Sequence, residues 1–99
     1  MAFVYLVRCA DGSLYVGWTE DVETRIATHN EGRGGSYTSR RRPVTLAFVE
    51  SHTTAELARR RERQIKRWSA AKKEALVSSD SDSLKRLAVS RASPRFNRF

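Results

Sequence analysis

Apolar residues fall into two short runs at the start of the chain. Residues 3–7 are almost continuously apolar and β-prone, which predicts a strand buried on both faces. Residues 14–18 predict a second strand, and Asp11-Gly12 between the two runs is a hairpin signal. The chain therefore opens with a predicted antiparallel hairpin.

A helix is predicted directly after this hairpin. Thr19-Glu-Asp places carboxylates at the positive end of a helix, and Val22 and Ile26 form its buried stripe. Arg25 and His29 are four residues apart and fall along one edge of that stripe, so they point along the sheet surface. Their ordinary roles would be snorkelling and a single structural hydrogen bond, and that alternative stays open beside a chemical role.

The polar and apolar pattern changes in the second half of the chain. Residues 31–43 form a long glycine-rich, basic loop with room for one helical turn, and such loops are usually functional or disordered. Residues 44–49 predict a third strand. The capping box Thr53-Thr-Ala-Glu56 predicts a helix that ends near residue 67.

The order of elements is β-β-α-β-α-α. It defines an α+β fold with a small three-stranded antiparallel sheet flanked by helices. Ser69 can cap the last of these helices, which would run to residue 77. We expect one domain over residues 1–78, followed over residues 79–99 by a short helix (83–90) and a basic tail.

Charge narrows the class of protein. Nineteen Lys and Arg residues against 11 Asp and Glu give a net charge of +8, which favours nucleic acid first and anionic membrane second as a partner. A soluble protein without a polyanion is the alternative. The single Cys9 excludes an intramolecular disulfide, and no apolar run reaches membrane or signal-peptide length. The expectation is a soluble, cytoplasmic protein with no membrane partner.

Tyr5 and Tyr15 are the first candidates for chemistry. Strand tyrosines more often pack in the core with a satisfied hydroxyl group, and that interpretation stays open for both. Gly17 lies two residues after Tyr15, and glycine inside a strand often marks close approach by a ligand or another backbone.

The length of the hairpin loop decides whether the two tyrosines can act together. A two-residue loop would put them on opposite faces of the sheet, whereas a loop of residues 10–12 pairs Tyr5 with Gly17 and puts both on one face. Glycine as the third residue suits the longer loop, so we predict Gly12 at positive φ. We also expect open space above Gly17 for a phosphate, with Arg25 and Glu62 approaching from the same side.

Glu62 is the candidate carboxylate. It lies at the border of an apolar arc on the capped helix, next to the small residues Ala55 and Ala58, which leave room for an ion or substrate. The alternative is a helix ion pair with Lys66 or Arg59, worth only ~0.2–0.5 kcal/mol. Arg61 interrupts the arc, whose predicted members are Leu57, Ala58, Ile65 and Trp68.

Basic residues gather in three segments: the glycine-rich loop, the run Arg40-Arg-Arg42 and the capped helix. A solvated face is the usual interpretation of such runs. Gly32-Arg-Gly-Gly35 is suited to presenting backbone N–H groups to phosphate. We predict nucleic-acid contacts at Arg33, Tyr37, Arg40, Arg41, Arg42 and Lys66.

Taken together, these motifs resemble the GIY-YIG nuclease superfamily, and most closely its small stand-alone bacterial members. The resemblance covers residues 2–77. It rests on the order and spacing of Phe3-Val-Tyr5, Tyr15-Val-Gly17, Arg25, His29-Asn30 with Gly32, Tyr37-Thr38, Arg42-Pro43 and Glu62-x-x-Ile65-Lys66.

The resemblance implies one active site, formed by Tyr5, Tyr15, Arg25, His29 and Glu62, that hydrolyses DNA phosphodiester bonds. Glu62 would hold one Mg²⁺ (or Mn²⁺) to polarise the scissile phosphate, and Arg25 would neutralise developing charge. One tyrosine would help deprotonate the attacking water. Tyr5 is favoured for this role, with Tyr15 and His29 assisting. RNA stays open as a further substrate.

Three positions depart from the superfamily pattern. Phe3 replaces a glycine, Trp18 stands where some members have a lysine, and residues 73–76 lack an asparagine that many members carry after the glutamate. The alternative is therefore a non-catalytic or weakly catalytic nucleic-acid-binding module with the same fold, which would keep its DNA affinity when Glu62 is lost. A third alternative, charge that serves solubility alone, predicts no DNA affinity even at low salt.

Overall fold

The computed structural model describes residues 1–79. Residues 80–99, which include the predicted short helix (83–90) and the basic tail, lie outside this part. The predicted α+β fold is confirmed, and α2 is the helical turn expected in the basic loop. The elements are β1 (Ala2–Arg8), β2 (Leu14–Thr19), α1 (Val22–Asn30), α2 (Ser36–Ser39), β3 (Thr45–His52) and α3 (Ala55–Lys66), followed by a helical segment over residues 70–79.

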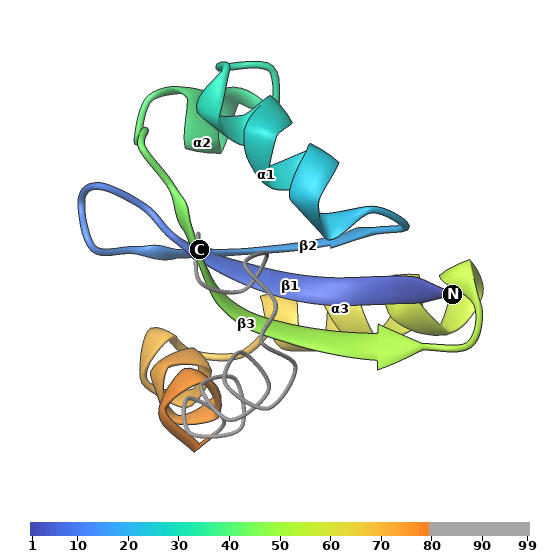
Figure 1. Ribbon diagram of the computed structural model, residues 1–99. Helices are drawn as coiled ribbons and strands as arrows, with labels where there is room; N and C mark the ends of the chain where they lie inside the picture. Colours follow the sequence, from blue (N-terminus) through green and yellow to red (C-terminus); the bar gives the residue numbers. More distant parts are fainter. Residues whose placement is uncertain (80–99) are drawn as a thin grey trace, which may run out of the picture.

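The sheet has the order β2-β1-β3, and β1 is antiparallel to both neighbours. Alternate side chains of β1 enter two separate cores. Val4 and Leu6 pack on one face, against α3, whereas Tyr5 and Val7 pack on the other, against Ile26 of α1. Figure 1 shows α1 and α2 on one side of the sheet and α3 on the other. The first strand is therefore buried on both faces, as its apolar run predicts.

The start of α3 lies one residue later than the capping box predicts. Thr54 is the N-cap, because its side-chain oxygen accepts a hydrogen bond from the Leu57 N–H at 3.1 Å. Thr53 and Thr54 are chemically equivalent as caps, so the sequence could not decide between them. Leu57 is 39% exposed and does not belong to the buried arc, whose fully buried members are Ala58 and Ile65.

Arg61 interrupts the apolar arc because it joins α3 to β3. Its Nε donates to Glu50 Oε1 at 3.0 Å, and its guanidinium lies 5.2 Å from the centroid of the Trp68 ring. His52 Nε2 lies 2.8 Å from the same Glu50 oxygen. The positive charge of Arg61 is therefore paired with Glu50, a half-buried carboxylate of β3.

Ser69 caps the helical segment 70–79 as predicted, since its oxygen accepts from the Lys72 N–H at 3.1 Å. Glu74 of this segment forms a two-pronged ion pair with Arg8, in which Arg8 Nη2 donates to Glu74 Oε1 at 2.8 Å. These bonds hold the pKa of Glu74 below its usual value. Residues 73–76, where the sequence lacks the asparagine that the resemblance leads one to expect, thus contribute Glu74, whose ion pair with Arg8 holds the segment against β1. No helix within residues 1–79 is long and apolar enough to cross a membrane.

Candidate active site

The β1–β2 hairpin closes with a three-residue loop. Gly12 N–H donates to the Cys9 carbonyl at 2.9 Å, and Cys9 N–H donates to the Ser13 carbonyl at 2.8 Å, which leaves residues 10–12 as the loop. Gly12 has a φ of 89°, in the region that glycine adopts without strain. The predicted loop length and the predicted conformation of Gly12 are both confirmed.

This loop fixes the register of the candidate tyrosines. Tyr5 pairs with Gly17, and Val7 pairs with Tyr15. Since side chains alternate along a strand, Tyr5 and Tyr15 project from the same face of the sheet, as predicted. That face is the one covered by α1 and α2.

Tyr5 fills the space above Gly17. It is 1% exposed, and a β carbon at position 17 would lie 2.3 Å from its hydroxyl oxygen and 2.5 Å from Cζ. The prediction of an open space for phosphate above Gly17 is therefore wrong. The close approach that a strand glycine marks is made here by the aromatic ring of the adjacent strand.

Tyr5, His29 and Thr38 form a buried hydrogen-bonded chain. Tyr5 Oη lies 2.8 Å from His29 Nε2, and His29 Nδ1 lies 2.8 Å from Thr38 Oγ1. Arg25 Nε donates to the Tyr5 oxygen at 3.3 Å. Because arginine can only donate, the Tyr5 proton is directed at His29 Nε2, and His29 carries its own proton on Nδ1.

Burial sets the charge of this chain. It raises the pKa of Tyr5 above its ordinary value of 10.0, against the opposing hydrogen bond and charge of Arg25. Burial, together with a smaller effect of the Arg25 charge, lowers the pKa of His29 to about 4. Both rings are therefore neutral at pH 7. The hydrogen-bonded chain consists of neutral groups, and Arg25 beside it carries a positive charge.

The glycine-rich loop closes over His29. A β carbon at Gly34 would lie 2.0 Å from His29 Nδ1, so only glycine lets the backbone approach the ring this closely. Gly35, the N-cap of α2, has a φ of 110°. These glycines are explained by packing around the histidine and by the turn into α2. Presentation of their N–H groups to a phosphate stays a prediction.

Tyr15 lies beside the buried chain in a stack of rings. Its ring contacts His29 edge-on at a centroid distance of 5.4 Å and stacks on Tyr37 at 5.7 Å with 27° between the ring planes. Lys66 Nζ of α3 lies 5.6 Å from the Tyr15 centroid. Tyr15 is half-buried and is therefore easier for solvent and substrate to reach than Tyr5.

Glu62 lies on a helix in the opposite layer of the fold. Its helix α3 packs on the Val4 face of the sheet, whereas α1 carries Arg25 on the Tyr5 face (Figure 1). The prediction that Glu62 and Arg25 approach from the same side is therefore wrong, because the two helices that carry them cover opposite faces of the sheet. Yet the charge of Glu62 adds to the burial that raises the pKa of Tyr5, so the two groups are within electrostatic reach.

The predicted alternative for Glu62, an ion pair on its own helix, is also present. Glu62 Oε2 lies 3.4 Å from Lys66 Nζ. The Glu62 side chain is only 16% exposed, although most cations of α3 are exposed to solvent. Pairing with Lys66 and proximity to the tyrosines are thus compatible, because Lys66 itself lies against Tyr15.

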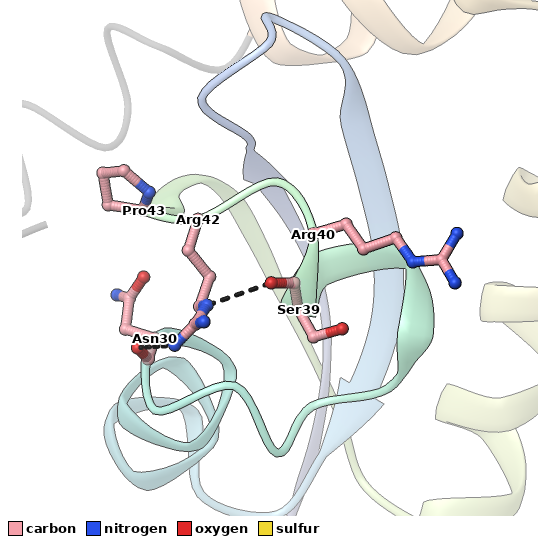
Figure 2. A pocket seen from close by; sticks show the side chains of 5 residues that line it. All are labelled: Asn30, Ser39, Arg40, Arg42 and Pro43. Atoms are coloured by element: carbon pink, nitrogen blue, oxygen red, sulfur yellow. Dashed lines mark hydrogen bonds between the residues drawn. The ribbon is translucent and has the colours of Figure 1, made fainter.

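The predicted nucleic-acid contacts at Arg40, Arg41 and Arg42 differ in what they touch. Arg42 donates to the backbone carbonyls of Ser39 at 3.0 Å and Asn30 at 3.4 Å, at the ends of α2 and α1. Within residues 1–79, Arg40 has no ion pair or side-chain hydrogen bond, and Figure 2 shows it turned away from the Arg42 bonds. The side chains of Arg41 and Arg42 thus donate hydrogen bonds within the protein, whereas the side chain of Arg40 extends outward.

Arg40 and Arg42 border a hollow of about 550 Å³ at the junction of α1 and α2. It is lined by Asn30, Ser39, Arg40, Arg42 and Pro43, and none of these belongs to the tyrosine cluster (Figure 2). Arg33 is exposed and forms an ion pair with Glu31 of the same loop. The contacts of the basic loop, namely the hollow and the Arg33–Glu31 ion pair, are therefore separate from those of the tyrosine cluster.

Two residues that support the site had no predicted role. Thr38 is fully buried, and its hydroxyl oxygen lies 2.8 Å from His29 Nδ1, where it completes the buried hydrogen-bonded chain. Asn30 binds both backbone groups of Val44, accepting from its N–H at 2.7 Å and donating to its carbonyl at 3.0 Å. Both belong to motifs on which the resemblance rests, His29-Asn30 and Tyr37-Thr38, but no sequence pattern shows which partner they meet.

A same-face pair of tyrosines, with an arginine on the first helix and a glutamate on the third helix, therefore lies around a three-stranded sheet. Residues 1–75 match the GIY-YIG catalytic domain, and the chain belongs to this family.

Close relatives are small bacterial proteins. A UPF0213 protein of Staphylococcus haemolyticus is 51% identical over 71 residues, which cover 72% of this chain and 87% of the relative. A UPF0213 protein of Staphylococcus saprophyticus is 47% identical over 77% of this chain and 93% of its own. The solution NMR structure of a UPF0213 protein from Bacillus halodurans is similar with a TM-score of 0.51 at 43% identity, covering 79% of this chain and 84% of that chain.

Proposed function

We propose that this protein is a divalent-metal-dependent endonuclease that hydrolyses phosphodiester bonds of DNA. The observation that carries the proposal is the Tyr5 hydroxyl group, held between Arg25 Nε and His29 Nε2 within electrostatic reach of Glu62. Membership of a family of catalytic domains supports an enzyme, and the net charge of +8 supports a polyanionic substrate.

Glu62 is the residue that would hold the metal ion. Residues 1–79 contain no group of three or more His, Cys, Asp and Glu side chains suited to a metal, and the proposed site has Glu62 as its one carboxylate. Mg²⁺ fits such a site, because it keeps several waters and is completed by substrate phosphate oxygens. Bound there, it would supply Lewis-acid polarisation of the scissile phosphate. The Lys66 ion pair is no obstacle, since helix pairs of this kind contribute only about 0.3–0.5 kcal/mol.

Arg25 stabilises negative charge on the phosphate. Its Nε is committed to Tyr5 at 3.3 Å, and among the described residues its terminal amino groups make no hydrogen bond. Those groups remain for phosphate oxygens, and the bond to Tyr5 holds the guanidinium in place before substrate arrives. Fixed donors of this kind stabilise developing charge without a reorganisation cost.

Tyr5 accepts the proton of the attacking water if its own proton moves to His29 Nε2, along the existing 2.8 Å hydrogen bond. In the free protein this transfer is unfavourable. Burial raises the pKa of Tyr5 above its ordinary value and lowers the pKa of His29 to about 4, so the Tyr5 hydroxyl group keeps its proton. The charge of Arg25 favours the ionised Tyr5 hydroxyl group but disfavours protonated His29, so Arg25 alone does not offset this cost. Tyr15, half-buried beside His29, assists at the more accessible edge of the site.

A nucleic-acid-binding module with weak or no cleavage is the second candidate. The observation that favours it is the single carboxylate of the site, already paired with Lys66. The two functions separate at Glu62, because binding to phosphates would survive its loss and hydrolysis would not.

The test compares Glu62→Gln with Glu56→Gln. Glu56 is an exposed carboxylate on the same helix, 3.8 Å from Arg60, and serves as the matched control. Supercoiled, linear, branched and single-stranded DNA would be incubated with Mg²⁺ and each protein. We expect the wild type and Glu56→Gln to cut at least one substrate, and Glu62→Gln to bind it without cutting. Cleavage by Glu62→Gln at the wild-type rate would refute the metal site, and binding of DNA without cleavage by any variant would favour the module.

A further inference from the structure

Arg41 lies at the centre of a set of contacts between the hairpin loop and the segment that follows α2. Its Nε donates to Asp11 Oδ2 at 3.0 Å, and its backbone carbonyl accepts from the Ala10 N–H at 2.9 Å. Its Nη1 donates to the Tyr37 carbonyl at 2.9 Å. One residue therefore ties loop 10–12 to the chain around Tyr37 through both its side chain and its backbone.

The same residue covers the ring of Tyr37. The Arg41 guanidinium carbon lies 3.8 Å from the ring centroid, well within the range of a cation–π interaction. The Tyr37 hydroxyl donates to Ser13 Oγ at 2.8 Å, and Ser13 Oγ donates to Asp11 Oδ1 at 2.6 Å. Tyr37 is thus held at its ring face by Arg41 and at its hydroxyl group by the hairpin loop.

Tyr37 in turn touches the candidate active site. Its ring stacks on Tyr15 at 5.7 Å, and Tyr15 contacts His29 at 5.4 Å. A column of contacts therefore runs from Asp11 through Arg41 and Tyr37 to Tyr15. Although Tyr37 is 38% exposed, its ring already stacks on Tyr15 and carries Arg41 on a face.

We propose that Arg41 is a positioning residue that sets the ring of Tyr15 in the active site by fixing Tyr37 against it, and that it is not a phosphate contact. The proposal rests on the proposed nuclease function. Arg41 donors are directed at Asp11 and at the Tyr37 carbonyl, whereas neighbouring Arg40 has no such partners among the described residues. Displacement of a reacting group by about 1 Å can lower a rate by up to about 100-fold, so a residue acting through Tyr15 can matter without touching DNA.

The experiment compares Arg41→Ala with Arg40→Ala. For each protein, kcat and KM for DNA cleavage, DNA affinity against salt concentration, and the NMR ring-proton shifts of Tyr15 and Tyr37 would be measured. For Arg41→Ala we expect kcat to fall by about 10-fold or more, with affinity within about twofold of wild type and an unchanged salt slope. The ring shifts of Tyr15 and Tyr37 should move towards values for unstacked rings. Arg40→Ala should instead weaken DNA binding and flatten the salt slope, while the ring shifts of Tyr15 and Tyr37 stay unchanged.

Asp11→Asn and Arg41→Lys provide the second line of test. Asp11→Asn removes the carboxylate that anchors Arg41, and should reproduce the kcat loss in part even if Arg41→Ala does not fold. Arg41→Lys keeps the charge over Tyr37 and should restore part of kcat. The proposal is overturned if Arg41→Ala weakens DNA binding and flattens the salt slope while the Tyr15 ring shifts stay in place. If the wild type cuts no DNA, the nuclease function fails, and the ring shifts still decide whether Arg41 positions Tyr15.

Discussion

The hydroxyl oxygen of Tyr5 lies 2.3 Å from the point where a β carbon of residue 17 would stand, so Tyr5 and Gly17 form one packing unit across β1 and β2. Gly17→Ala would force the Tyr5 ring away from His29. Overpacking of a core usually costs about 1–3 kcal/mol, and we expect a loss of this size in the free energy of unfolding, measured with urea. Cleavage should fall with it, because Tyr5 leaves its hydrogen bond to His29.

A double-mutant cycle separates this contact from a general weakness of β2. Tyr5→Ala removes the ring that a side chain at position 17 would strike, so Gly17→Ala should cost much less in the Tyr5→Ala background than in the wild type. Additive losses in the double variant would show that the cost of Gly17→Ala arises elsewhere than at Tyr5.

Local patterns were sufficient to predict the strands, the hairpin loop and the register. The glycine at the third loop position decided the register, and the register put Tyr5 and Tyr15 on one face. The placement of Glu62 was not predictable in the same way. Its spacing on α3 marks the border of the buried face, but only tertiary packing shows that α3 covers the face opposite Tyr5.

The partners of polar side chains were the least predictable part of the site. Thr38 and His29 are nine residues apart, and they meet because the loop between them folds back through Gly34. The run Arg40-Arg-Arg42 is uniform in sequence, yet Arg42 binds backbone carbonyls whereas Arg40 extends away. Identical residues in a charge run differ in role because each points in a different direction from the backbone.

His29 makes the stability of the protein dependent on pH. Its pKa is about 4 in the folded protein and 6.5 in an exposed histidine, so the unfolded chain takes up a proton first as pH falls. The stabilising contribution is complete above pH 6.5 and is lost as pH falls from 6.5 to 4. A shift of this size corresponds to a loss on the order of 3 kcal/mol.

Urea unfolding of the wild type and His29→Gln at several pH values tests this contribution. We expect the free energy of unfolding of the wild type to fall more steeply between pH 6.5 and pH 4 than that of His29→Gln. Carboxylates such as Glu74, whose pKa is lowered by Arg8, lose their contribution at lower pH and do so in both proteins. Parallel curves for the two proteins over this window would mean that His29 is protonated as easily in the folded state as in the unfolded state.

Removal of divalent metal should stop cleavage and spare DNA binding. Only one carboxylate serves the proposed site, so the ion is held weakly without substrate and EDTA should abolish activity within the mixing time. Added Mg²⁺ or Mn²⁺ should restore it in the wild type, and much higher concentrations should be needed in Glu62→Ala. Undiminished cleavage in EDTA would eliminate the metal role, whereas loss of DNA binding in EDTA would mean that metal bridges the complex itself.

Arg40 and Arg42 should contribute to different properties of the protein. Arg40 extends from the chain without a partner in the described part of the structure, so Arg40→Gln should weaken DNA binding and leave the fold intact. For duplex DNA, the slope of log K against log salt should change by about 0.9 for each phosphate that the protein no longer neutralises.

Arg42→Gln removes two donors from the carbonyls of Ser39 and Asn30 and should lower the free energy of unfolding by about 1 kcal/mol, because these bonds are exposed. Its salt slope should stay near that of the wild type. Binding isotherms over a range of salt concentrations, together with urea unfolding of both variants, measure the two effects. If Arg42→Gln flattens the slope and Arg40→Gln does not, the phosphate-binding position lies inside the hollow between α1 and α2 instead of at its rim.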